Sequence, residues 1–108
     1  MIEVAITYEL LPDIDQNAYF LLFKKAVVPI LQQPGIVEIR AMRSLSDPPG
    51  VLIMIGWESM ADWNRFEFAK EWTTLIEELK KSFITNMKLQ VWGPSPIAPE
   101  LLKPPKTA

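Results

Sequence analysis

The segment VLIMIGWESMADWNRF, Val51–Phe66, decides the fold. Its first seven residues are apolar on both alternating faces, a pattern expected for an inner strand that is covered on two sides. Ser59 and Asp62 follow at the spacing of a capping box, with the shorter Asp in place of the preferred Glu or Gln. A short helix is therefore predicted to begin at Met60, directly after a central strand.

The flanking sequence predicts three more strands and two more helices. Strands are expected over residues 2–9, 37–45 and 87–92, where apolar residues alternate, with Ser46–Gly50 as a hairpin turn. Helices are expected over residues 16–33, capped by Asp13 or Asp15 and loosened near its end by Pro29, and over residues 72–83. This order predicts the α+β class: a ferredoxin-like split βαβ unit with a four-stranded antiparallel sheet, strands one and three at its centre and helices on one face.

Two apolar surfaces follow from this arrangement. The first helix is expected to direct a broad stripe inward, formed by Phe20, Phe23, Val27, Ile30 and Leu31. The uncovered face of the sheet would carry Ala5, Thr7, Met42, Trp92 and alternate residues of the third strand, which is too apolar for a patch left in water. A second copy packed sheet against sheet would cover it, so a homodimer is expected.

The chain divides into a folded domain over residues 1–93 and a proline-rich tail over residues 94–108. The tail holds five of the ten prolines and cannot form a helix or an inner strand, because so many positions lack a backbone donor. It is interpreted as a disordered or polyproline-like tail. The alternative is an arm that packs on a partner subunit through Ile97, Leu101 and Leu102.

Composition excludes several classes of function. The net charge of the 108 residues is −2 and the basic residues are scattered, which argues against nucleic acid as a partner. No apolar run approaches a membrane span, and the N-terminus lacks the basic start of a signal peptide, so a cytoplasmic location is expected. The chain has no Cys and no His, which excludes thiolate nucleophiles, histidine bases and histidine metal ligands. No metal and no organic cofactor are predicted.

Two motifs point to a family. The segment VVPILQQPG, Val27–Gly35, ends a helix in a proline-containing turn before a strand, and GWESMADWNRF, Gly56–Phe66, joins a strand end to a short helix. In these features residues 1–93 resemble the antibiotic biosynthesis monooxygenase-like family of dimeric α/β barrel proteins. The resemblance implies a dimer and an apolar pocket between sheet and helices, bordered by the short helix Met60–Phe68.

The same resemblance implies two kinds of activity. Several relatives are oxygenases that need no metal or flavin and oxidise electron-rich polycyclic or quinol-type substrates, whose anion gives an electron to oxygen. Others bind and degrade haem through a histidine ligand and an asparagine on the first strand. This chain has no histidine and offers Ala5 and Thr7 on that strand, so haem degradation is disfavoured.

Three residues are candidates for catalysis. Asn64 and Arg65 are the strong donors of the short helix and could hold a phenolate or enolate oxygen, although a solvated helix face explains them as well. Tyr8 could donate to a substrate oxygen, or could pack its ring at the end of its strand.

Four further residues are candidates for ligand binding. Trp57 is expected in the core, in a dimer interface or beside the ligand. Trp63 and Phe66 are core anchors or pocket walls, and either one matches the pocket aromatic of the family. Arg40 is expected to pair with Glu38 or Glu58, or to reach a ligand.

Three functions therefore stay open at this point. The chain is a cofactor-independent monooxygenase, a non-catalytic protein that binds a small apolar or aromatic molecule, or a dimerisation domain whose pocket is filled by its own side chains.

Overall fold

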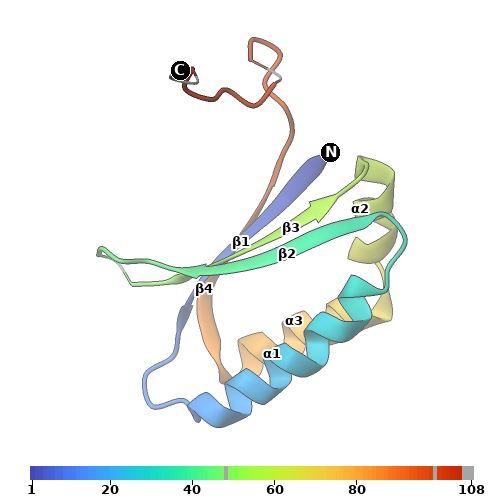
Figure 1. Cartoon of the computed structure of the whole chain (residues 1–108). Helices are drawn as coiled ribbons and strands as arrows, with labels where there is room; N and C mark the ends of the chain where they lie inside the picture. Colours follow the sequence, from blue (N-terminus) through green and yellow to red (C-terminus); the bar gives the residue numbers. More distant parts are fainter. Residues whose placement is uncertain (48, 99, 106–108) are drawn as a thin grey trace.

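The computed structural model describes residues 1–47, 49–98 and 100–105 and has the expected α+β architecture (Figure 1). The elements follow the chain as β1 (Ile2–Leu10), α1 (Gln16–Leu31), β2 (Ile36–Arg43), β3 (Val51–Trp57), α2 (Met60–Glu67), α3 (Lys70–Ser82) and β4 (Ile84–Trp92). Pro48, which belongs to the predicted hairpin turn, lies outside the described residues.

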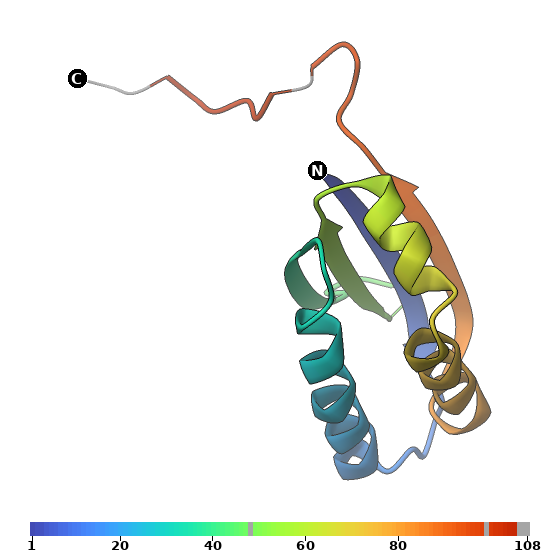
Figure 2. The ribbon, with the colours of Figure 1, turned by 90° about the vertical axis from the view of Figure 1, so that its right-hand side faces the viewer.

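The four strands form one antiparallel sheet in the order β2-β3-β1-β4, which confirms that β1 and β3 are central. Val4 pairs with Ile55 and Ile6 pairs with Ile53, and all four side chains are buried on the helix side. The three helices pack on that side alone (Figures 1 and 2).

Two predicted caps are confirmed. The Asp15 carboxylate accepts hydrogen bonds from the backbone N–H groups of Asn17 and Ala18 at 3.0 and 3.1 Å, which fixes the start of α1 at Gln16. The Ser59 hydroxyl accepts from the N–H of Asp62 at 3.3 Å and donates to its carboxylate at 2.7 Å. Because these side chains satisfy N–H groups that a helix leaves unpaired, they set where each helix begins.

The predicted stripe of α1 is wrong at two positions. Phe20 and Leu31 are 54% and 49% exposed, whereas Phe23, Val27 and Ile30 face the sheet as expected. Tyr19 completes the inner face, with its ring 5.9 Å from that of Phe83. Because α1 is apolar on nearly all sides, the spacing of apolar residues does not identify which side is buried.

The sheet face away from the helices is uncovered by any described element. Ala5 and Met54 lie side by side in its middle and are half-buried, while Met42 and Trp92 are 43% and 55% exposed. This placement agrees with the apolar open face expected from the sequence. The homodimer that would cover it stays a prediction.

Beyond Trp92 the described residues form no helix or strand, and the chain runs away from the sheet and helices (Figures 1 and 2). Ile97, Leu101 and Leu102 are each at least 80% exposed. Among the described helices, none is long and apolar enough to cross a membrane.

Candidate functional site

The aromatic residues that follow β3 form one cluster in the core. The ring of Trp57 lies 6.1 Å from Trp63 and 5.5 Å from Phe66, and Trp63 meets Trp72 edge-on at 5.4 Å. All four side chains are at most 6% exposed. Tilted and edge-on pairs at these separations are the stable arrangements of aromatic rings, so this cluster anchors α2 and α3 to the end of β3.

Trp57 is distinctive within this cluster. Its indole N–H is buried and has no hydrogen-bond partner among the described residues. An unpaired buried donor costs about 1–3 kcal/mol, and the surrounding aromatic packing must offset that cost.

The two predicted catalytic residues of α2 are not part of the aromatic cluster. Asn64 and Arg65 are exposed, and the guanidinium of Arg65 lies 3.4 Å from the carboxylate of Asp62 one helical turn away. Trp63 and Phe66 on the same helix are buried, whereas Asn64 and Arg65 face solvent and do not line the cavity described below.

Arg40 lies on the open face of the sheet, remote from the helices. Its guanidinium is 3.8 Å from the carboxylate of Glu38, which is one of the two expected partners. It also lies 3.9 Å from the carboxylate of Glu3 on β1. The sequence pattern does not indicate Glu3, because that neighbour arises from strand pairing across β3.

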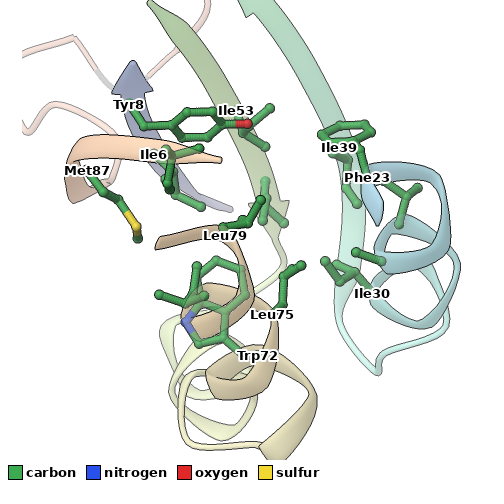
Figure 3. Close-up of a pocket in the computed structure, with 15 residues that line it drawn as sticks. Ile6, Tyr8, Phe23, Ile30, Ile39, Ile53, Trp72, Leu75, Leu79 and Met87 are labelled. Atoms are coloured by element: carbon green, nitrogen blue, oxygen red, sulfur yellow. The ribbon is translucent and has the colours of Figure 1, made fainter. Parts of the chain in front are cut away.

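An apolar cavity of about 50 Å³ lies between the sheet and helices α1 and α3 (Figure 3). The sheet contributes Ile6, Tyr8, Ile39, Ile53, Ile55, Ile84 and Met87, α1 contributes Phe23, Ala26, Val27 and Ile30, and α3 contributes Trp72, Leu75, Ile76 and Leu79. No residue of Met60–Phe68 lines it. The cavity therefore lies beside the next helix along the chain rather than beside the short helix.

Tyr8 and Trp72 carry the only side-chain nitrogen or oxygen atoms among these lining residues. The Tyr8 hydroxyl is hydrogen-bonded to the hydroxyl of Tyr19 on α1. Burial in apolar surroundings, and then this hydrogen bond, raises the pKa of Tyr8 well above its usual range. Tyr8 therefore stays protonated at neutral pH and can donate a hydrogen bond.

A second hollow lies on the outer surface between α1 and α3. It has a volume of about 310 Å³, and charged residues of both signs line it, with Lys25 on α1 and Lys70, Glu71 and Glu78 on α3. A third, of about 810 Å³, lies at the hairpin end of the sheet and includes Thr7, Met42 and Lys88 from the open face. Within residues 1–47, 49–98 and 100–105, no three His, Cys, Asp or Glu side chains are grouped so as to hold a metal ion.

A model of the family described as antibiotic biosynthesis monooxygenase matches residues 1–80. No curated protein matches the sequence. A solved structure of a proposed antibiotic biosynthesis monooxygenase from Deinococcus radiodurans has 19% sequence identity and a TM-score of 0.77, over 98% of this chain and 100% of that one.

Two further structures are similar at lower identity. One from Nitrosomonas europaea, also a proposed antibiotic biosynthesis monooxygenase, has 13% identity and a TM-score of 0.71, over 86% of this chain and 97% of that one. A variant of SnoaB, a cofactor-independent oxygenase from Streptomyces nogalater, has 10% identity and a TM-score of 0.70, over 84% and 89%. At such identities these structures show a shared fold and no shared activity. The family match covers most of the domain and shows that this chain belongs to the antibiotic biosynthesis monooxygenase family.

Proposed function

We propose that this protein binds a small, largely apolar aromatic molecule between the sheet, α1 and α3, where the cavity widens toward the outer surface to admit it. The observation that carries the proposal is the composition of the cavity wall, which is aliphatic and aromatic apart from the Tyr8 hydroxyl and the Trp72 indole N–H. Small-molecule sites typically combine an apolar lining with a few polar groups that fix orientation.

Tyr8 is the proposed contact for an oxygen atom of the ligand. Its raised pKa keeps the hydroxyl neutral, so it acts as a donor toward a ketone or phenolate oxygen and not as a base. Either hydroxyl of the Tyr8–Tyr19 pair can be the donor, so on ligand binding the Tyr8 O–H can turn from Tyr19 to the ligand oxygen. The pair thus supplies one directed hydrogen bond at one end of an apolar space.

We further propose that the bound molecule is oxidised by O₂ without a cofactor. The lack of His and Cys leaves no histidine base or thiolate, so a substrate that ionises by itself suits this site. With 9-anthrone, the C10 methylene loses two hydrogens and gains one oxygen atom as a carbonyl, while the second oxygen atom leaves as water. The hydrogen bond from Tyr8 would stabilise the anion at the C9 oxygen, where charge develops before oxygen reacts. The similarity to SnoaB, which is named a cofactor-independent oxygenase, supports the proposal of a cofactor-independent oxidation.

A homodimer in which two open sheet faces pack together is part of the same proposal. Half-buried Met54 and exposed Met42 and Trp92 lie on that face, and apolar patches of this kind mark interaction sites. The cytoplasmic location expected from the sequence also stays a prediction.

Equilibrium dialysis of 2-naphthol and of 9-anthrone under nitrogen tests binding. We expect the wild type to bind both and Tyr8→Phe to bind roughly three- to tenfold more weakly, because one net hydrogen bond is lost. Tyr19→Phe is the matched control, because it removes the hydrogen bond between the two hydroxyls but keeps the Tyr8 hydroxyl as a donor. Equal weakening in both variants would show that the Tyr8 hydroxyl is not the contact.

Oxygen uptake with 9-anthrone at neutral pH tests the reaction. Uptake above the buffer rate that falls in Tyr8→Phe, with Asn64→Ala unchanged, supports the oxygenase. Binding without uptake would leave a non-catalytic ligand-binding protein, and the absence of both would overturn the proposed function.

A further inference from the structure

The cavity and the outer groove between α1 and α3 lie on opposite sides of one wall. Three side chains line both hollows: Ala26 and Ile30 on α1, and Leu75 on α3. Figure 3 shows Leu75 on the side of α3 that faces Ile30. These three residues are therefore shared by the walls of the interior cavity and the surface groove.

The wall shared by the two hollows is purely apolar. Within the part of the chain that the structure describes, no hydrogen bond or ion pair joins α1 to α3. Ile30 is buried, whereas Leu75 is partly exposed and can rotate toward the groove. Because apolar contacts are not directional, a rotation of the Leu75 side chain breaks no hydrogen bond or ion pair.

The volumes of the cavity and the groove also favour a connection between them. A cavity of about 50 Å³ holds a few water molecules and no aromatic ligand. The groove adds about 310 Å³. Joined across the wall, the two hollows reach the lower end of the roughly 300–1,000 Å³ range of small-molecule sites.

We infer that ligands enter between α1 and α3 and that Leu75 is the gate, so that the side chain at this position sets which molecules are admitted. This inference rests on the proposed binding function. The class of ligand follows from the joined space: a flat aromatic part occupies the inner cavity together with the room that Leu75 vacates, and a polar substituent stays in the groove. Lys25 and Lys70 line the groove together with Glu71 and Glu78, so an uncharged hydrogen-bonding substituent suits the groove better than a strong acid or base.

A thiol in the cavity wall reports this opening without any ligand. The chain has no Cys, so Leu79→Cys introduces a single thiol at a position that lines the cavity and not the groove. Its alkylation by iodoacetamide is followed by mass spectrometry. In this background we expect Leu75→Ala to speed labelling roughly tenfold and Ala26→Phe to slow it, since local openings set such rates.

Ile76→Ala is the matched control, because Ile76 is the neighbour of Leu75, lines the cavity and does not line the groove. Ile76→Ala removes a similar side chain and leaves the wall intact. When urea is used to bring the variants to equal stability, the thiol of Leu79→Cys should be labelled in Ile76→Ala within about twofold of the rate in the parent. Equal acceleration by Leu75→Ala and Ile76→Ala, or no effect of Leu75→Ala and Ala26→Phe, overturns the gate.

Dialysis with 2-naphthol and 9-anthrone separates the gate from the proposed function. Leu75→Ala should improve binding of the three-ring anthrone more than that of the two-ring naphthol, by roughly threefold or more, because the bound ligand spans both hollows and the larger ligand has to displace more of the Leu75 side chain. If labelling follows the prediction and neither probe binds the wild type, the proposed function fails and the entrance stands. If both probes bind and labelling does not respond, the entrance fails and the proposed function stands.

Discussion

Gly35→Ala is expected to destabilise the protein strongly, because Gly35 occupies a turn that a side chain would disturb twice. Its φ is +82°, a conformation that costs an L residue roughly 1–2 kcal/mol. A Cβ atom there would lie 2.2 Å from Cγ of Asp62 and 2.4 and 2.6 Å from its two carboxylate oxygens, so the Asp62 side chain must move.

The displaced carboxylate is the hydrogen-bond partner of Ser59, the residue that caps α2. It accepts the Ser59 hydroxyl at 2.7 Å and lies 3.4 Å from Arg65. Loss of that hydrogen bond costs about 0.5–1.5 kcal/mol, and the exposed ion pair adds little. Together with the backbone cost, we expect Gly35→Ala to lower the free energy of unfolding by about 2–3 kcal/mol.

Urea unfolding followed by circular dichroism measures this loss. Gly93→Ala is the control, because a Cβ at Gly93 meets nothing within 4 Å. In an Asp62→Ala background, Gly35→Ala should cost only the backbone share of about 1–2 kcal/mol. An equal cost in both backgrounds would refute the clash with Asp62, and a cost below about 0.5 kcal/mol in the wild type would refute the whole argument.

Three further outcomes are expected. Above pH ~10 the unfolded chain loses the Tyr8 proton while the folded chain retains it, so the free energy of unfolding should fall by up to about 1.4 kcal/mol per pH unit. Urea titrations at rising pH should show a smaller fall in the free energy of unfolding for Tyr8→Phe than for the wild type. An equal fall in both proteins would contradict the burial of the Tyr8 hydroxyl. Leu52→Asp on the open sheet face should weaken a dimer at least about 100-fold in light scattering, because a carboxylate would be buried in the interface. A monomeric wild type at micromolar concentration would remove the basis for that dimer. Trp63→Ala should cost about 3–5 kcal/mol in thermal or urea unfolding, whereas Phe68→Ala, at an 81% exposed position, should change stability little.

The sequence predicts the fold well because its signals are local. The alternation in β1, the doubly apolar β3 and the capping residues Asp15 and Ser59 each act over a few residues, and the structure has all of them. Where the signal is weak the prediction fails. At the start of β2 a register shift between Ile36 and Glu38 leaves Val37 46% exposed, although simple alternation assigns it to the apolar face.

The candidate site is less predictable because it depends on how elements pack. Tyr8 is a sequence candidate that does line the cavity, but Phe23, Ile30 and Leu75 appear in the sequence only as parts of apolar helix stripes. Whether two such stripes meet in full contact or leave a space depends on the distance between helices and sheet. That distance is not contained in the spacing of apolar residues along either helix.

The aromatic cluster has an optical consequence. Trp57, Trp63 and Trp72 are buried within about 6 Å of one another or of Phe66, while Trp92 is 55% exposed on the open sheet face. Buried indoles emit at shorter wavelength than hydrated ones, and neighbouring indoles exchange excitation energy. The native emission spectrum should therefore contain two populations: a buried group that reports unfolding, and Trp92, which reports the burial of the sheet face. Assembly and unfolding of this chain can thus be followed separately in one spectrum, without a label.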